Sequence, residues 1–180
     1  GNLLRSLDAN GAWTERMVRT ADGRIWVADM SNKLLRIADP GATNWVDSVA
    51  TGTEPEGLVV DANGRIWALC TGGFIAPQPR LQAFDNSGAM VADFELDTLA
   101  GYPNNLELSP DGQTLYWISS LGLHRMAIDA AAPDAGAWVP SAGAKWYALG
   151  CDPQTGILYV GDARDFASAG RVSRFDSSGT

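Results

Sequence analysis

Two long segments of the sequence mix flat aromatic side chains with hydrogen-bonding groups. TGGFIAPQPR spans residues 71–80, and GDARDFASAG spans residues 161–170. Ligand pockets combine apolar walls with a few polar groups that fix orientation, so both segments predict small-molecule binding. The plainer alternative is that Gly and Pro shape these loops while their Phe side chains cover a rim of the fold. The candidate ligand-binding residues in the two segments are Phe74, Gln78, Asp162, Asp165 and Phe166.

Three more aromatic residues each lie just before or at the start of a short apolar stretch. They are Trp13, Tyr102 and Trp146. Aromatic side chains supply large contact area and stack on planar groups, so these three are candidates for stacking on a flat ligand.

A further set of residues recurs at one position, five residues before a turn. Three of its four members, Glu15, Glu56 and Asn104, carry side-chain oxygens, and the fourth is Tyr147. Oxygen ligands suit Ca²⁺, which takes six to eight of them, so these three residues form an alternative metal site. The main expectation is no cofactor, with polar groups that are solvated or that cap strands. No catalytic residue is expected, because a nucleophile and base pair is not evident around the only histidine, His124.

The turns themselves belong to a fourfold repeat. Each copy runs from a short strand through a turn that contains Gly into a strand that carries an aromatic residue. The aromatics recur every 41 to 49 residues, at Trp26, Trp67, Tyr116 and Tyr159. That period is typical of β-propeller blades, so the predicted fold is all-β, with about four blades and ligand loops on one face of the disc. The repeated aromatics are expected to fill the spaces between blades.

Each repeat predicts four strands, within one propeller region over residues 1–180. Residues 1–8 are expected to form an outer strand. They either complete the last blade and close a four-bladed ring, or belong to the C-terminal part of a propeller with seven or eight blades. The blades are expected at about 14–49, 56–97, 104–140 and 145–180.

Charge and hydropathy exclude several classes of partner. The net charge is −8 and no basic run occurs, which argues against nucleic acid, because phosphates require clustered Lys and Arg. No stretch approaches the ~18 apolar residues that a membrane-spanning helix needs. The first ten residues do not resemble a secretion signal, so any targeting segment lies outside this sequence.

The order of several motifs resembles a known family. LYWI at 115–118, HRM at 124–126, DPQTG at 152–156 and YVGDA at 159–163 resemble the C-terminal half of YncE-like and NHL-like β-propellers. The resemblance is closest to the bacteroidete surface-propeller branch, which carries a domain-of-unknown-function label. It implies seven or eight blades and, for some members, surface lipoproteins that capture cobalamin for an outer-membrane transporter.

A second resemblance concerns the third repeat. Residues 102–116 are similar to the Asn-containing repeat of gluconolactonase-like propellers, which implies that Asn104 is a metal ligand. That family also needs an acidic ligand in the next blade, where this sequence has Trp146 and Tyr147. The departure counts against lactonase activity.

The sequence therefore predicts a non-enzymatic propeller that binds a ligand, such as a corrinoid at a bacterial surface. The expected partner is a small molecule or an outer-membrane transporter protein, with no nucleic acid and no direct membrane span. The protein is expected to be exported, to the cell surface or the periplasm. A metal-dependent lactonase and a protein-docking scaffold are the two alternatives.

Overall fold

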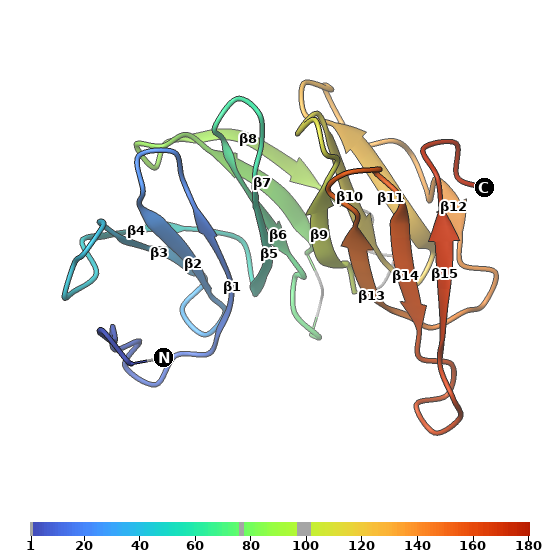
Figure 1. Cartoon of the computed structure of the whole chain (residues 1–180), viewed down its shortest axis with the longest axis horizontal. Coiled ribbons are helices and arrows are strands. Elements are labelled where there is room, and N and C mark those ends of the chain that lie inside the picture. Colours follow the sequence, from blue (N-terminus) through green and yellow to red (C-terminus); the bar gives the residue numbers. More distant parts are fainter. Residues whose placement is uncertain (1, 76–77, 97–101) are drawn as a thin grey trace.

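A computed structural model describes residues 2–75, 78–96 and 102–180 as four antiparallel sheets (Figure 1). Within each sheet the strands follow chain order, so every neighbour is a hairpin partner. The sheets lie side by side in an arc, and the first strands of successive sheets contact one another along its inner edge. This arrangement confirms the predicted all-β blades. The described residues contain no helix that could cross a bilayer.

The strand bounds follow the four repeats closely. Blade 1 comprises β1 (Thr14–Arg19), β2 (Ile25–Asp29), β3 (Leu34–Ala38) and β4 (Asp47–Ala50). Blade 2 comprises β5 (Pro55–Val60), β6 (Ile66–Cys70), β7 (Arg80–Phe84) and β8 (Met90–Glu95). Blade 3 comprises β9 (Asn104–Leu108), β10 (Thr114–Ile118), β11 (Gly122–Ala127) and β12 (Val139–Pro140). Blade 4 comprises β13 (Trp146–Cys151), β14 (Leu158–Asp162) and β15 (Arg171–Phe175).

The hydrophobic core lies between blades, in three clusters. Trp26 packs between blades 1 and 2, Trp67 between blades 2 and 3, and Tyr116 between blades 3 and 4. These residues are between 0% and 7% exposed, which confirms the predicted role of the repeated aromatics. Tyr159 is the exception. It is 38% exposed and belongs to none of the three clusters. Burial of this aromatic and aliphatic surface holds neighbouring blades together.

The outer strand predicted for residues 1–8 is not formed, since residues 2–8 contain no strand. This segment instead bonds to the loop between β3 and β4. The Arg5 guanidinium donates to the carbonyl of Ala42 at 2.9 Å, and the indole of Trp45 donates to the carbonyl of Asp8 at 2.7 Å. Figure 1 shows the N-terminus beside blade 1, at the opposite end of the arc from β15. The four-bladed ring that would have required pairing between residues 2–8 and β15 is therefore not formed.

The Gly-containing turns of the repeats also join adjacent blades. Gly112 has a φ of +68°, and a Cβ atom built on it would lie 2.9 Å from the backbone nitrogen of Ala62 in the neighbouring blade. The Ala62 amide donates to the Gly112 carbonyl across that contact. Gly64 has a φ of +79° in the equivalent turn of blade 2, but no heavy atom lies within 4 Å of its Cβ position.

Substitution at these two glycines separates backbone strain from blade packing. Gly64→Ala is expected to lower the free energy of unfolding by about 1 kcal/mol, because a left-handed φ strains any residue with a Cβ. Gly112→Ala is expected to cost about 2 to 3 kcal/mol, because the new methyl also pushes the two turns apart. Urea unfolding of the two variants measures the difference. Equal losses would show that the turns do not need this close approach.

Candidate functional site

The first strand of each of the four blades has an irregular register near its start. These starts lie at one end of the space that the four strands enclose. The register of each first strand against its second strand shifts there by a residue. In β5 the shift leaves Glu56 without a partner opposite, and in β13 it does the same for Tyr147. Bulges of this kind redirect side chains and recur beside active sites. Here they gather polar side chains from four blades.

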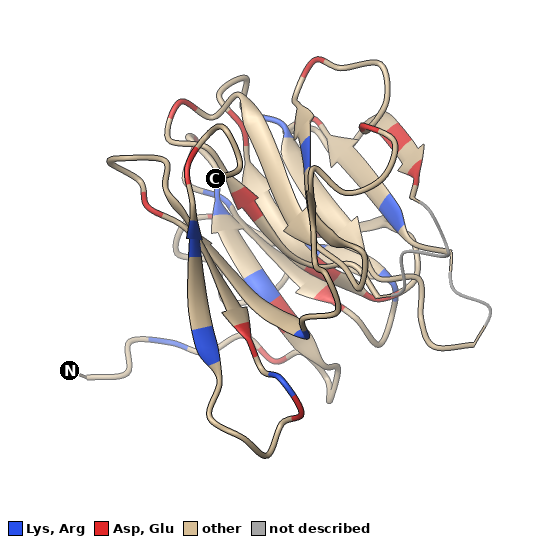
Figure 2. Cartoon of the chain, turned by 90° about the vertical axis from the view of Figure 1, so that its right-hand side faces the viewer, with Lys and Arg blue, Asp and Glu red and all other residues tan. Residues whose placement is uncertain are grey.

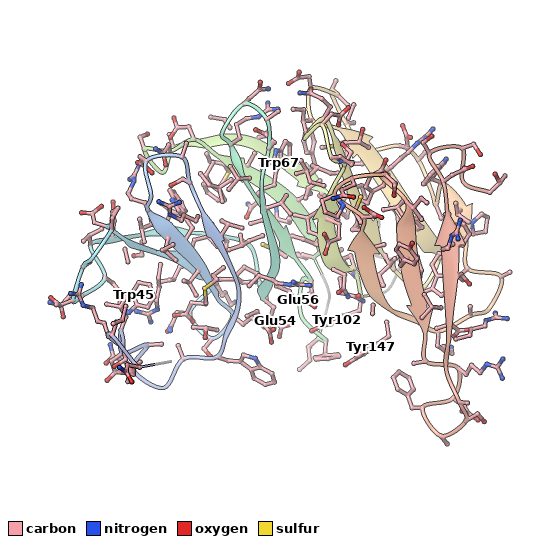
Figure 3. All side chains as sticks on the ribbon, in the orientation of Figure 1. Trp45, Glu54, Glu56, Trp67, Tyr102 and Tyr147 are labelled. Atoms are coloured by element: carbon pink, nitrogen blue, oxygen red, sulfur yellow. The ribbon has the colours of Figure 1, made fainter. Side chains whose placement is uncertain are left out.

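These side chains line a hollow of about 900 Å³, which we call the mouth site. Figure 3 shows four of them, Glu54, Glu56, Tyr102 and Tyr147, close together at the lower ends of the inner strands. The hollow is large enough for a small-molecule ligand, and its lining mixes aromatic faces with carboxylates. Its lining residues are Trp13, Glu15, Arg16, Met30, Ser31, Glu54, Glu56, Phe74, Tyr102, Asn104, Asn105 and Tyr147.

Glu54 anchors one wall of the mouth site. Its carboxylate accepts hydrogen bonds from the Thr71 hydroxyl at 2.9 Å and from the phenol of Tyr102. Burial, together with this hydrogen bond, raises the pKa of Tyr102 to about 12, so its phenol stays protonated and donating. Phe74 stacks on Tyr102 with ring centroids 4.5 Å apart. The predicted residues Phe74 and Tyr102 therefore belong to one aromatic wall.

Glu56 is the most perturbed acid in the mouth site. Burial raises its pKa to about 7, and the negative charges of Glu15 and Glu54 contribute in the same direction, while Arg16 opposes them. Among the described residues, no donor reaches the Glu56 carboxylate. A half-buried carboxyl with a pKa near neutrality exchanges protons at physiological pH, which is a property of catalytic acids and bases.

The third and fourth blades contribute amide and phenol groups. The Asn105 amide donates to the side-chain oxygen of Asn104 at 2.5 Å and to the Tyr147 carbonyl at 3.1 Å. Asn105 has a φ of +55°, and Glu54 on the facing blade has a φ of +57°. Such conformations cost about 1 kcal/mol or more in residues other than Gly and cluster at functional sites. Two of them occur on the wall of the mouth site.

Two of the three residues predicted as alternative metal ligands accept hydrogen bonds within the protein. Glu15 accepts the indole N–H of Trp13 at 2.5 Å, and the Asn104 oxygen accepts the Asn105 amide. Tyr147 occupies the fourth blade's equivalent position, where a neutral phenol is a poor Ca²⁺ ligand. Among residues 2–75, 78–96 and 102–180, no group of three acidic, His or Cys side chains is arranged to hold a metal. The alternative metal site at Glu15, Glu56 and Asn104 contains only two of these acidic side chains, so it stays a prediction.

The remaining predicted ligand residues lie away from this hollow or at its edge. Gln78 lines a smaller hollow of about 360 Å³ beside the mouth site, which shares Glu54 and Phe74 with it. Phe166 is exposed and meets Tyr147 edge-on, with centroids 5.6 Å apart. Trp146 packs against Phe175 in the core between blades 3 and 4, so its ring does not face the hollow.

The two candidate aspartates in the loop 161–170 shape that loop. Asp162 is buried, and its carboxylate accepts the backbone amides of Lys145 and Arg164 and an ion pair from Arg171. Backbone donors, that of Arg164 first, hold its pKa below the usual range. Asp165 accepts the amides of Ala167 and Ser168. These bonds give both carboxylates a structural role.

Five lining residues of the mouth site were not selected from the sequence: Arg16, Met30, Ser31, Glu54 and Asn105. Glu54, Arg16 and Asn105 each lie next in sequence, or two positions away, from a residue that the repeat register selected. The bulges add one residue to each first strand, so a register taken from the turns cannot tell which neighbouring side chain faces inward. The closeness in sequence of Glu54 to Glu56, and of Asn105 to Asn104, could have indicated that Glu54 and Asn105 line the site.

The raised pKa of Glu56 predicts a stability that falls with pH. Its usual value is 4.5 and its folded value about 7, so between these pH values the folded protein binds a proton that the unfolded chain has lost. Folding is then favoured below pH 4.5, and this contribution disappears as pH rises through 7. We expect the free energy of unfolding to drop by about 2 kcal/mol over this window, allowing for partial solvent exposure.

Chemical denaturation at several pH values checks this expectation against a matched variant. Glu56→Gln cannot titrate, so its stability profile should be flatter than that of the wild type and should lie above it at pH 8. Parallel profiles for the two proteins would show that Glu56 has an ordinary pKa.

Comparison with solved structures recovers this architecture in longer chains. No family model and no curated protein matches the sequence. Virginiamycin B lyase from Staphylococcus aureus superimposes with a TM-score of 0.75 at 15% identity, over 96% of this chain and 55% of that one. A hydrazine synthase from Kuenenia stuttgartiensis gives 0.72 at 14%, over 91% and 51%. A putative gluconolactonase gives 0.65 at 15%, over 86% and 59%.

The chain is a β-propeller. It spans between 51% and 59% of the length of these three solved chains. At this level of identity the likeness shows the fold alone. The predicted resemblance to propeller proteins is confirmed at that level, whereas the narrower bacteroidete branch, with its surface location and transporter partner, stays a prediction.

The prediction that the protein is not an enzyme is corrected by the same comparison. The structures that share this fold are named as a lyase, a synthase and a putative lactonase. The prediction rested on the lack of a nucleophile beside His124. In the structure His124 does contact a hydroxyl, that of Ser119 at 2.7 Å, and its other ring nitrogen lies 3.0 Å from the Gly136 carbonyl. Acid–base chemistry at a carboxyl with a pKa of about 7, such as that of Glu56, does not require a histidine.

Proposed function

We propose that the β-propeller is a hydrolase that opens a lactone or a related ester in the mouth site, with Glu56 as the proton acceptor. The observation that carries the proposal is the Glu56 carboxyl, whose pKa is about 7 and which lies on the wall of a 900 Å³ hollow. A base with a pKa near the working pH combines a useful ionised fraction with the driving force for proton transfer. The likeness to a putative gluconolactonase supports this class of substrate.

The chemistry follows from the groups that surround Glu56. In the ionised state its carboxylate takes a proton from a water molecule as that water attacks the ester carbonyl carbon. The developing negative charge on the carbonyl oxygen is matched by the Arg16 guanidinium, which lines the same hollow. Protonated Glu56 then returns the proton to the departing ring oxygen, and the C–O bond breaks to give a hydroxy acid.

An elimination is the second candidate, and the likeness to virginiamycin B lyase favours it. The same carboxylate would remove a carbon-bound proton, and the ester oxygen would leave as a carboxylate with formation of a C=C bond. Hydrolysis in water enriched in ¹⁸O labels the product acid, whereas elimination does not. The label therefore distinguishes the two reactions.

The test is a lactone panel assayed with the wild-type protein and the Glu56→Gln variant. Titration of the acid released from γ-butyrolactone, δ-valerolactone and glucono-δ-lactone measures the rate. Saturable release by the wild type that is lost in the variant supports the proposal. Equal rates with both proteins would remove Glu56 from the chemistry.

A further inference from the structure

The walls of the mouth site present aromatic rings to solvent. Trp13 is 67% exposed, Phe74 is 83% exposed and Tyr147 is 66% exposed. Exposed large aromatics scattered singly are ordinary, but these three come from different blades and line one hollow. Tyr102 adds a fourth ring, stacked on Phe74. The hollow therefore offers several ring faces to whatever occupies it.

The same hollow carries an excess of negative charge. Its lining includes the side chains of Glu15, Glu54 and Glu56 and a single cation, Arg16. The Glu15 and Glu54 carboxylates are held in place by the Trp13 indole and the Tyr102 phenol, so acid and ring are joined in two pairs. Figure 2 shows acidic residues spread along the described chain, in keeping with the net charge of −8. Such a field attracts cations toward the site.

We infer that the substrate or ligand of the mouth site carries an organic ammonium group, held between these rings and the two paired carboxylates. A ring face attracts a cation through its quadrupole, and the attraction grows as water is excluded from the contact. A carboxylate at the edge of the ring cluster offsets part of the cost of removing water from an enclosed ammonium group.

Trp13 and Glu15 form the first pair. Glu15 lies on β1, and Trp13 immediately precedes that strand. The indole N–H points at the carboxylate, which orients the ring and leaves most of its surface exposed. Tyr102 with Glu54 forms the second pair, braced by Thr71. Glu56 lines the same hollow as Glu15 and Glu54, whose charges raise its pKa. An ammonium group bound at the two pairs would place the rest of the substrate beside the proposed base.

This inference rests on the proposed function only in assigning the substrate to the mouth site, and its test does not use turnover. Choline and 3,3-dimethylbutan-1-ol have nearly the same shape, but only choline is charged. Binding of each to the full protein is measured by titration calorimetry at low ionic strength. Choline is expected to bind at least tenfold more tightly than the neutral alcohol, which corresponds to about 1.4 kcal/mol.

Two variants assign the binding to the mouth site. Trp13→Leu and Glu54→Gln should each weaken choline binding by at least fivefold. Trp45→Leu is the matched control, because Trp45 lies on the flank of blade 1, away from the hollow (Figure 3), and should leave binding unchanged. Circular dichroism confirms that each variant is folded.

Three results would overturn the inference. The first is equal affinity for the charged and the neutral probe. The second is no choline binding at about 10 mM, which is on the order of the weakest affinity that a single cage of this kind gives. The third is choline binding that survives both mouth-site variants. None of these results tests the proposed reaction, which the lactone panel tests separately. Loss of hydrolysis in Glu56→Gln with no choline binding would keep the catalytic base and discard the cationic substrate.

Discussion

Replacement of Glu56 by glutamine is expected to lower kcat for lactone opening by about 10²- to 10⁴-fold, the range typical of a lost general base. The amide has nearly the size of the carboxyl but cannot accept a proton from water. Because no donor reaches the carboxylate among the described residues, the substitution leaves no hydrogen-bonding partner stranded. The loss should therefore appear in kcat, with KM changed little.

The pH profile adds a signature that a merely structural role would not produce. The acting form of Glu56 is the carboxylate, so kcat/KM of the wild type should rise with pH through about 7 and level off above it. The residual activity of Glu56→Gln should lack this inflection. Steady-state rates between pH 5 and pH 9 measure both curves.

A matched control exists on the first strand of blade 3. Glu107 lies on β9, and burial raises its pKa as well, but it lines a separate hollow with Cys151 and Pro153. Glu107→Gln should keep wild-type kcat and the wild-type inflection. If Glu107→Gln loses activity as Glu56→Gln does, the mouth site is not the reaction centre.

The fold was predictable because its signal repeats. The aromatic of each repeat, such as Trp26 or Trp67, recurs with a spacing typical of propeller blades, and the turn before it carries Gly at a left-handed φ. Four copies of a weak local signal reinforce one another. The segment 2–8 has no such copies, and its apolar pattern alone could not show that it bonds to the loop between β3 and β4.

The site was predictable only to within a residue or two. Counting from the turns selected Glu56 and Tyr147 correctly as lining residues, because the strand length between turn and mouth is constant. The counting could not show that a bulge lets Asn105 share the wall with Asn104, nor that Trp146 turns into the core while Tyr147 remains exposed. Those outcomes depend on packing between blades, which no single repeat encodes. The pKa of Glu56 likewise depends on Glu15 from another blade.

The repeats also differ in how they satisfy their buried polar groups. In blade 2 the indole N–H of Trp67 donates to Asp61 at 2.8 Å. In blade 1 the equivalent residues are Trp26 and Thr20, and the indole N–H of Trp26 is buried with no partner within the described residues. A buried polar group without a partner costs about 1 to 3 kcal/mol. The aspartate at the turn of blade 2 therefore carries a larger share of that blade's stability than its counterpart in blade 1.

Asp61→Ala is accordingly expected to be the most destabilising change, lowering the free energy of unfolding by about 4 kcal/mol. The Asp61 side chain is fully buried, and it accepts the amides of Asn63 and Arg65, the Arg65 guanidinium at 2.7 Å and the Trp67 indole. Alanine removes all four bonds at once and leaves the indole and part of a cation without partners in the core between blades 2 and 3.

The aspartate at the same position in blade 4 provides the control. Asp152 accepts bonds from the amides of Gln154 and Thr155 at a solvent-exposed turn, so water replaces the carboxylate in Asp152→Ala and the loss should be much smaller. Urea denaturation followed by tryptophan fluorescence measures both variants. Asn at position 61 should recover part of the loss, because its oxygen can still cap the two backbone amides. If Asp61→Ala and Asp152→Ala lost the same free energy, stability would come from the turn and not from the buried network, and the blades would be held together by apolar packing alone.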